Sequence, residues 1–360
     1  MLGRYDLRLP WSVLFRAELI SKLQENVHLA PQTTLNVGGT ARYFLRAESE
    51  EDVRSGFDFA FEKGLPVFIL GGGSNLLVSD KGFDGLVIQI TIKGITDHGD
   101  TLIAAAGEDW DSFVEYCVDH DLARVECLSG IPGTIGGTPV QNVGAYGQEV
   151  SETIVSVRCF DRNTRAIVEL SNAECGFKYR RSIFNTTERD RYVVLAVEYK
   201  LSSNGKPKLA YKDLIDAFGD SMPSLKQVRE RVLQIRRAKS MVIDVNDPNS
   251  RSAGSFFKNP VISNEEFSKL KQRFGDPIPN FPAGDGSVKV PAAWLIEKSG
   301  FAKGFILGKA GISTNHTLAI INRGGATAAE IFSLKNMIQE GVFEKFSIEL
   351  VPEPVFVGEF

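Results

Sequence analysis

The sequence predicts an α+β protein built from two or three lobes. Its 360 residues are too many for one ordinary hydrophobic core. A hydrophobic content of 43% and a charged content of 24% are typical of a globular protein rather than of a disordered or fibrous one. From Thr33 onward, short apolar runs typical of strands alternate with longer segments of helical periodicity.

Charge and composition exclude several classes of function. The net charge of −4 provides no broad basic surface, so we expect no nucleic-acid partner. The cysteines lack C-x-x-C spacing and are expected to be buried free thiols, and the histidines lack metal-ligand spacing, so we expect no catalytic metal. No signal-peptide core or membrane-spanning stretch is visible. We therefore expect a cytoplasmic protein without membrane insertion, either a monomer or a weak oligomer.

Local patterns predict the elements in order. Residues 1–32 are expected to form a short helical extension. Compact apolar runs predict strands at 67–70, 86–88 and 102–105, a hairpin from 154–159 and 167–170, and a strictly alternating strand at 193–201. Apolar residues at three- and four-residue spacing predict helices over 110–118, behind Glu108-Asp109, and over 225–235, behind Pro223-Ser224.

The segment 244–250 is a run of turn-forming residues, and we place a domain boundary just before it, near residue 240. The remainder has its own strands and helices, with helices predicted at 292–297 and 328–340. The chain thus divides into an extension (1–32), a two-lobed region (33–205), a loop with a connecting helix (206–239) and a C-terminal domain (240–360).

Two segments contain glycine at a density that a simple turn does not need. The first, Leu70-Gly71-Gly72-Gly73-Ser74-Asn75, follows a strand and lets backbone N–H groups converge on one point, which suits a pyrophosphate. It matches neither the Rossmann nor the Walker pattern, so on its own a plain turn is an equal alternative. The second runs from Ser129 to Gly147 and mixes glycine with small and apolar residues, as backbone packed against a ligand does. A long surface loop is its alternative.

Five strings, in this order, resemble the UDP-N-acetylenolpyruvoylglucosamine reductase family. They are Leu70-Gly71-Gly72-Gly73-Ser74-Asn75, Ile131-Pro132-Gly133 through Gly147, Tyr179-Arg180-Arg181-Ser182-Ile183-Phe184, Gly254-Ser255-Phe256-Phe257-Lys258-Asn259-Pro260, and Pro352-Glu353-Pro354. The resemblance covers nearly the whole chain beyond residue 33. It implies a two-lobed FAD-binding region of the PCMH type, followed by a C-terminal α/β substrate-binding domain.

The resemblance also implies a reaction. NADPH, the co-substrate, reduces a non-covalently bound FAD, which then reduces UDP-N-acetylenolpyruvoylglucosamine to UDP-N-acetylmuramate in peptidoglycan precursor synthesis. The residues it assigns to FAD lie in the two glycine segments: Leu70, Gly71, Gly72, Gly73, Ser74, Asn75, Leu76, Ile131, Pro132, Gly133, Gly136, Gly137, Gln141, Asn142, Gly144, Ala145 and Tyr146.

By the same resemblance, Arg180, Ser255 and Glu353 match the catalytic positions. A guanidinium holds a carboxylate or enolate oxygen in a bidentate manner, a serine hydroxyl supplies a proton, and a glutamate orients the enolate or assists proton transfer. From residue chemistry alone, a surface or structural ion pair is the commoner role for Arg180, and a helix cap or turn is the favoured role for Ser255. Glu353 is equally a solvated charge. Arg181 doubles the arginine, and Glu349 is a rival for the catalytic glutamate.

The residues that the resemblance assigns to the UDP-sugar are Tyr179, Tyr211, Lys239, Asn259, Lys289 and His316. Tyr211 resembles the tyrosine of the substrate loop in the type I branch, although by itself it is equally a surface residue. Two other functions remain as alternatives: another FAD-dependent oxidoreductase of the same superfamily, or a nucleotide-sugar-binding protein without catalysis. The first would often hold FAD covalently through histidine or cysteine, and neither glycine segment contains a histidine.

Overall fold

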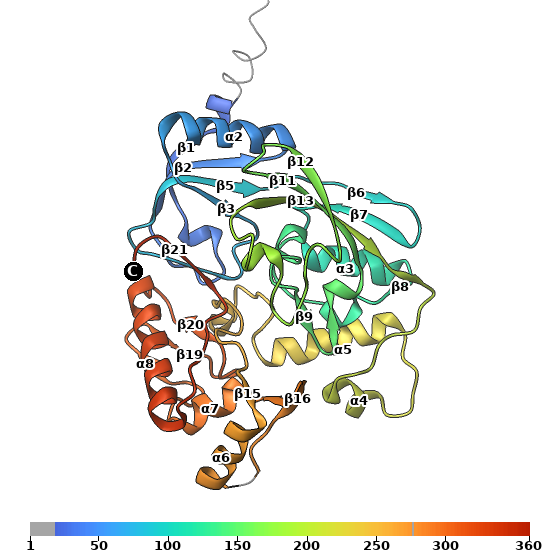
Figure 1. Cartoon of the computed structure of the whole chain (residues 1–360), viewed down its shortest axis with the longest axis vertical. Helices are drawn as coiled ribbons and strands as arrows, with labels where there is room; N and C mark the ends of the chain where they lie inside the picture. The colour runs from blue at the N-terminus through green and yellow to red at the C-terminus, as the bar shows by residue number, and fades with distance from the viewer. Residues whose placement is uncertain (1–18, 276) are drawn as a thin grey trace, which may run out of the picture.

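The structure, a computed structural model, describes residues 19–275 and 277–360. The first lobe is a four-stranded sheet with helix α2 packed over it (Figure 1). The sheet has the order β1-β2-β5-β3, and its elements are β1 (Gln24–His28), β2 (Thr40–Ala47), α2 (Glu50–Lys63), β3 (Val67–Leu70) and β5 (Phe83–Ile90). The strand predicted at 67–70 is confirmed, and the strand at 86–88 is the centre of β5.

The second lobe is a five-stranded antiparallel sheet of order β12-β11-β13-β7-β6. Its elements are β6 (Ile95–Asp97), β7 (Thr101–Ala105), α3 (Trp110–Asp119), β11 (Ile154–Asp161), β12 (Ile167–Ser171) and β13 (Tyr192–Lys200). The predicted hairpin is confirmed as β11 and β12, and the alternating strand as β13. Short strands complete this part of the chain: β8 (Leu122–Ala123), β9 (Gly144–Ala145), β10 (Gln148–Glu149) and β14 (Ser202–Ser203).

Two helices connect this region to the C-terminal domain, α4 (Lys212–Phe218) and α5 (Leu225–Ala238). The side chain of Ser224 accepts a hydrogen bond from Gln227 N–H and forms a capping box at the start of α5. The Asp109 side chain caps α3 by accepting from Ser112 N–H. Each cap satisfies an N–H group that has no partner inside its helix. Helices α3 and α5 therefore begin where their sequence signals predicted.

The C-terminal domain combines two small antiparallel sheets with three helices (Figure 1). Its elements are β15 (Val261–Ser263), α6 (Asn264–Phe274), β16 (Phe281–Gly284), β17 (Ser287–Lys289), α7 (Ala292–Lys298), β18 (Ile306–Leu307), β19 (Ala310–Ile312), β20 (Ile320–Asn322) and α8 (Ala328–Phe346). The helices predicted at 292–297 and 328–340 are confirmed as α7 and α8, the latter six residues longer.

Strand β21 (Val355–Val357) brings the end of the chain back to the first lobe, where it pairs in parallel with β4 (Leu76–Val78). In return, Leu35, Val37 and Leu77 are buried in the hydrophobic core of the C-terminal domain. Hydrophobic burial of this kind stabilises the contact between the two parts. The pairing also fixes residues 351–354 beside the first glycine segment.

The N-terminal extension differs from the prediction. Residues 19–22 are helical, but residues 24–28 form β1, which pairs with β2 from Gln24↔Phe44 to His28↔Thr40. The helical prediction failed because β1 is a short edge strand, exposed along most of its length, so its sequence carries little alternation. The other residues of the predicted extension, 1–18, lie outside the described residues.

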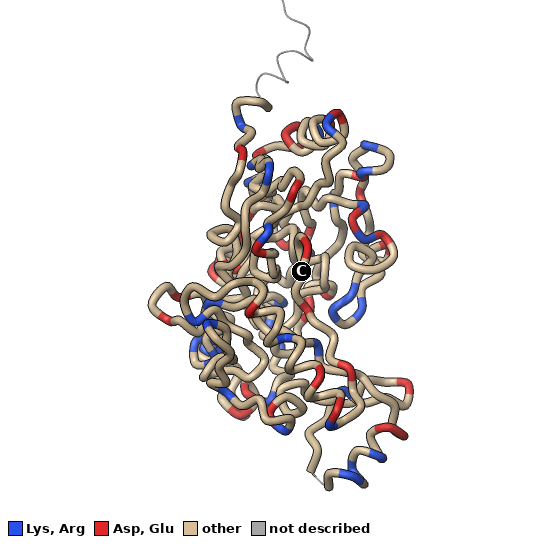
Figure 2. Tube along the Cα trace, turned by 90° about the vertical axis from the view of Figure 1, so that its left-hand side faces the viewer, with Lys and Arg blue, Asp and Glu red and all other residues tan. Residues whose placement is uncertain are grey.

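Two further observations concern composition. All four cysteines, Cys117, Cys127, Cys159 and Cys175, are buried and free, as predicted, and burial raises the pKa of each thiol. Basic and acidic residues occur in both the upper and the lower parts of the molecule (Figure 2). Among the described residues, no helix combines the length and apolarity that crossing a bilayer requires.

Candidate active site

The two glycine segments lie against each other. A Cβ on Gly72 would be 2.7 Å from the Cα of Gly133, and a Cβ on Gly133 would be 3.0 Å from Ser74 Oγ. Ser74 Oγ donates a hydrogen bond of 2.9 Å to the carbonyl of Pro132. Glycine at position 72 is therefore required for the close approach of two backbones, and glycine at position 133 suits its φ of +128°.

This junction contains polar groups without partners. Among the described residues, the backbone N–H groups of Gly72, Gly73, Ser74 and Asn75 donate to no protein acceptor. The hydroxyl of Thr134 is buried there and also lacks a hydrogen-bond partner. Gly72 is exposed and its N–H can bond to water, but Gly73 and the Thr134 hydroxyl are buried, and buried polar groups are nearly always paired. Free donors around a glycine turn therefore suit a ligand with anionic oxygens. The junction thus fits the pyrophosphate of a dinucleotide.

Other residues predicted to bind the cofactor have internal partners. Asn75 Nδ2 donates to Gln141 Oε1 at 3.0 Å and to the carbonyl of Glu353 at 3.2 Å, which joins both glycine segments to the C-terminal segment. Asn142 is 1% exposed, and its amide bonds to Glu149, to the carbonyl of Lys178 and to Ser151 N–H. Asn142 therefore shapes the second segment through contacts inside the protein.

Arg180 is held in a tight turn. Lys178 and Arg181 exchange backbone hydrogen bonds of 2.9 and 3.0 Å, which leaves Tyr179 and Arg180 at the turn's centre. Arg180 has φ +54°, a left-handed conformation that is strained for a residue with a Cβ. Its Nη2 donates to the carbonyl of Gly144 at 2.9 Å. The turn therefore directs the guanidinium toward the second glycine segment, whereas Arg181 is exposed.

The guanidinium of Arg180 also reaches Glu353. Arg180 Nε lies 3.5 Å from Glu353 Oε1, and the two side chains are only 22% and 11% exposed. Arg180 Nε is buried and has no hydrogen-bond partner among the described residues. Glu349, the rival glutamate, is exposed. The structure therefore pairs Arg180 with Glu353.

Ser255 reaches the same place through backbone pairing. The N–H of Glu353 donates to the carbonyl of Phe256 at 2.9 Å, and the N–H of Lys258 donates to that of Val351 at 3.0 Å. The segments 256–258 and 351–353 thus run side by side, and Ser255 directly precedes this pairing. Three distant stretches of sequence, around residues 180, 255 and 353, meet at the edge of the second glycine segment.

His316 lies beside Ser255, with Nε2 at 3.5 Å from Ser255 Oγ. Burial, together with the positive charges of Lys239, Lys303 and Arg236, lowers the pKa of His316 to about 4. Its imidazole is therefore neutral at pH 7. A neutral imidazole has one nitrogen that can accept a hydrogen bond from a hydroxyl and one N–H group that can donate a hydrogen bond.

The residues predicted to bind the UDP-sugar form two groups. In one, Lys289 Nζ lies 3.9 Å from the centre of the Tyr179 ring, and Asn259 hydrogen-bonds to Tyr179. Asn259 Oδ1 also accepts from Ala292 N–H at the start of α7. Burial lowers the pKa of Lys289, because removal from water disfavours its charged form. Tyr179 thus contacts the C-terminal domain directly.

The second group surrounds the start of α4. Tyr211 is the N-cap residue of this helix and packs edge-on against Tyr146, with ring centres 5.3 Å apart. Lys239, at the end of α5, lies 3.5 Å from Asp213. Lys239 belongs to the cations around His316, so this group extends toward the Ser255 region.

Sequence reasoning missed two charged residues in this region. Glu149 Oε2 accepts from Asn142 at 2.7 Å and lies near Lys289, although nothing in its local pattern marks it. Arg236 is 7% exposed, hydrogen-bonds to Tyr146 and donates from Nη2 to the carbonyl of Met241 at 2.7 Å. Arg236 lies four positions after the buried Val232, so a charged residue on an apolar helical stripe was the available signal.

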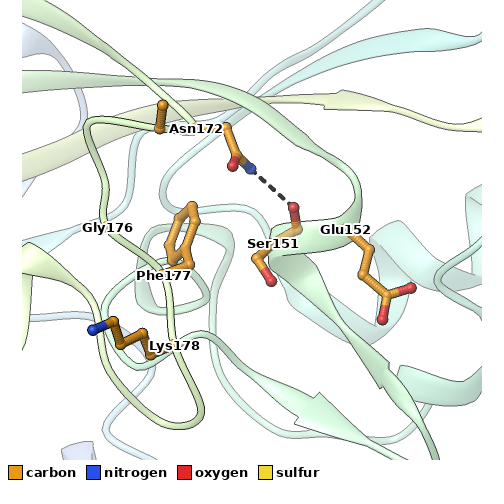
Figure 3. A pocket seen from close by; sticks show the side chains of 7 residues that line it. Ser151, Glu152, Asn172, Gly176, Phe177 and Lys178 are labelled. Atoms are coloured by element: carbon orange, nitrogen blue, oxygen red, sulfur yellow. Dashed lines mark hydrogen bonds between the residues drawn. The ribbon is translucent and has the colours of Figure 1, made fainter.

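A surface cavity of about 370 Å³ lies close to the Tyr179–Arg180 turn (Figure 3). It is lined by Ser151, Glu152, Asn172, Ala173, Gly176, Phe177 and Lys178, and the Asn172 amide hydrogen-bonds to the carbonyl of Ser151 at its wall. The cavity contains none of Arg180, Ser255 and Glu353. The convergence of those three segments therefore marks the candidate site better than the cavity does.

Two family models match the chain. An FAD binding domain matches residues 41–170, which include both glycine segments. The C-terminal domain of UDP-N-acetylenolpyruvoylglucosamine reductase matches residues 247–357, which include Ser255 and Glu353.

Full-length relatives agree with these matches. The chain is 46% identical to the UDP-N-acetylenolpyruvoylglucosamine reductase of Thermobifida fusca over 94% of this chain and 99% of that protein. It is 47% identical to the enzyme of that name from Streptomyces coelicolor, over 92% of this chain and 89% of that protein. The crystal structure of UDP-N-acetylenolpyruvylglucosamine reductase from Thermus caldophilus is similar with a TM-score of 0.67 at 25% identity, covering 93% of this chain and 100% of that one.

Proposed function

Since the chain belongs to the UDP-N-acetylenolpyruvoylglucosamine reductase family and is a flavin-dependent oxidoreductase, we propose that NADPH is its reductant and that it forms UDP-N-acetylmuramate for peptidoglycan synthesis. The observation that carries the proposal is the convergence of Arg180, Ser255 and Glu353 at the edge of the second glycine segment. The proposal also takes the protein to be cytoplasmic, with NADPH and the enolpyruvyl UDP-sugar as its small-molecule partners.

The glycine junction is proposed to hold FAD. The free N–H groups of residues 72–75 and the Thr134 hydroxyl would donate to the pyrophosphate, and Gly144 to Tyr146 would lie along the flavin. When bound, FAD supplies the hydride chemistry, and the protein supplies position and charge. We propose non-covalent binding, because the described cysteines are buried and neither glycine segment contains a histidine.

Arg180 is proposed to stabilise the negative charge that develops on the substrate. Addition of hydride to the terminal enolpyruvyl carbon places charge on the adjacent carbon and its carboxylate. A guanidinium has five donors, and Arg180 uses one for Gly144 and directs another toward Glu353. The remaining N–H groups suit a carboxylate or enolate oxygen, and their fixed orientation lowers the cost of reorganisation during the reaction.

Ser255 is proposed to protonate the resulting carbanion. The Ser255 O–H bond breaks, a C–H bond forms on the substrate, and the serine oxygen must then regain a proton. His316, 3.5 Å away, is placed to accept from the hydroxyl at rest and to orient it. Lys239 belongs to the cations around His316, so positive charge near the serine favours its transient alkoxide.

Glu353 is proposed to keep Arg180 in place and to assist proton transfer. Its backbone N–H bonds to Phe256, the residue after Ser255, while its side chain faces Arg180. A single residue thus sets the separation between the proposed proton donor and the proposed cation. Tyr179, Asn259 and Lys289 are proposed to contact the sugar nucleotide from the C-terminal domain, and Tyr211 and Lys239 from the opposite side.

An anaerobic stopped-flow experiment tests the proposal. Purified protein should show flavin absorbance, and acid precipitation should release the flavin into the supernatant. NADPH should bleach the flavin, and UDP-N-acetylenolpyruvoylglucosamine should restore it with one NADPH oxidised per substrate reduced. Flavin retained on the precipitate, or bleached flavin that the substrate fails to reoxidise, would contradict the proposal.

A further inference from the structure

The segment that leads to Tyr211 is attached to the second lobe at Lys208. The N–H of Lys208 donates to Glu126 Oε1 at 3.1 Å, its carbonyl accepts from Cys127 Sγ at 3.4 Å, and its Nζ pairs with Glu152 at 2.8 Å. The first two contacts use backbone atoms only three residues before Tyr211. The position of the tyrosine therefore depends on what holds the backbone of Lys208.

The holding group is a buried carboxylate. Glu126 is 0% exposed, and its oxygens accept from Gln148 Nε2 at 2.8 Å, from Lys208 N–H and from Arg124 N–H at 2.7 Å. Arg124 has φ +99°, a strained conformation for a residue with a side chain. A buried charge with three donors is strongly held, and the loss of one partner is costly.

The same carboxylate connects to the second glycine segment. Gln148 is 1% exposed, directly follows Gly144 to Gly147, and accepts from Cys127 N–H at 2.9 Å as well as donating to Glu126. A Cβ on Gly147 would lie 2.9 Å from the Cβ of Ala210, and Tyr146 packs on Tyr211. The glycine segment and the tyrosine segment thus share one buried polar network.

We propose that Glu126 and Gln148 are positioning residues, which fix the Tyr211 segment against the glycine segment so that the tyrosine is in place when the UDP-sugar binds. This proposal rests on the proposed function for its substrate. In it, Glu126 and Gln148 touch neither FAD nor substrate and act only through the backbone of Lys208 and the ring of Tyr211. They are expected to affect substrate capture, while reduction of the flavin by NADPH does not depend on them.

The test is a double-mutant cycle in the FAD-loaded protein. Glu126→Gln replaces an acceptor with a donor inside the network and is expected to raise the KM for the enolpyruvyl substrate about tenfold. In a Tyr211→Ala background, the same change should raise KM less than about twofold, because coupled residues show non-additive effects. FAD content and the rate of flavin reduction should stay at the wild-type values. If Glu126→Gln does not fold, Gln148→Met combined with Tyr211→Ala in the same double-mutant cycle tests the proposal instead.

Hydrogen exchange over residues 206–215 measures how firmly the Tyr211 segment is held, and it requires no substrate. Exchange should be faster in Glu126→Gln and unchanged in Glu152→Gln, a control that removes only the ion pair to Lys208 Nζ. Equal increases in KM with and without Tyr211, or unchanged exchange in Glu126→Gln, would overturn the proposal. If the wild-type protein does not oxidise NADPH with this substrate, the proposed function fails. The exchange data alone then test whether Glu126 holds the Tyr211 segment in place.

Discussion

The two halves of the candidate site are built by different means. The half formed by residues 70–76 and 131–137 offers the backbone N–H groups of residues 72–75 and the Thr134 hydroxyl, and glycine there allows close approach of two backbone segments. The half formed by Arg180, Ser255 and Glu353 offers charged and hydroxyl side chains from three separate parts of the sequence. In the proposed function, the first half recognises a ligand by shape and donors, whereas the second performs proton and charge chemistry.

This difference determines what effect a substitution in each half should have. A side chain with a chemical role can be replaced without disturbing the fold, so the loss should appear in one step of the reaction. A glycine at a backbone junction has no side chain that could take part in the reaction, so its replacement should appear as lost stability and lost cofactor. Four variants test whether the halves separate in this way.

Arg180→Met should have the largest effect. Removal of one preorganised donor typically slows catalysis about 10²–10³-fold, because the developing charge loses its fixed partner. We expect that loss in the reoxidation of reduced flavin by the enolpyruvyl substrate, measured by anaerobic stopped flow. Arg181→Met is the matched control, since Arg181 is exposed, and should retain the wild-type rate. Comparable losses in both variants would remove Arg180 from its proposed role.

The difference between the halves also explains what the sequence could predict. The helices α3 and α5 were predictable because their caps and apolar stripes are local signals, and family matches confirm the resemblance and the FAD-binding domain. The density of glycine in two segments is likewise visible in sequence. The strand β1 was not predictable, since its pairing with β2 rather than its own pattern determines it.

The side-chain half could be assembled from sequence only through the resemblance. Arg180 and Glu353 are brought together by the pairing of 351–353 with 256–258 and by a strained turn, and no local pattern encodes either. The same holds for Arg229, which is buried and forms an ion pair with Asp111 from another helix. Partners that are distant in sequence require the tertiary structure.

Ser255→Ala should have the next largest effect and should separate the two half-reactions. Reduction of the flavin by NADPH should be nearly normal, while reoxidation by the substrate should slow at least about a hundredfold, as expected for loss of a general acid. Both rates come from single-turnover stopped flow. If both half-reactions slow equally, Ser255 is not the proton donor and the two halves of the site do not separate.

Gly72→Ala tests the backbone half. The added Cβ would lie 2.7 Å from the Cα of Gly133, and backbone cannot move aside as a flexible side chain can. Overpacking of this kind costs about 1–3 kcal/mol, so we expect a lower Tm and weaker retention of FAD. Gly137→Ala is the control for stability alone, because among the described residues nothing lies within 4 Å of a Cβ there, so its Tm should stay near the wild-type value. Normal FAD retention in Gly72→Ala would show that the glycine junction is not a cofactor site.

His316→Gln should have the smallest effect, on the pH dependence of stability. Burial, with Lys239, Lys303 and Arg236, lowers the folded-state pKa of His316 to about 4. Between that value and the unfolded pKa of about 6.5, the unfolded chain binds a proton that the folded protein does not. Stability should therefore fall as the pH decreases through this window.

The contribution of His316 between pH 7 and pH 5 is on the order of 1–2 kcal/mol, and His316→Gln should remove it while leaving stability at pH 7 nearly unchanged. Urea unfolding at the two pH values measures the difference. His316 lies beside Ser255 in the side-chain half, whereas Gly137 belongs to the backbone half. Gly137→Ala should therefore keep the wild-type pH dependence of stability. An identical pH dependence in His316→Gln would mean that the imidazole is not buried beside Ser255 among these cations, and the assignment of His316 as the serine's partner would then fail.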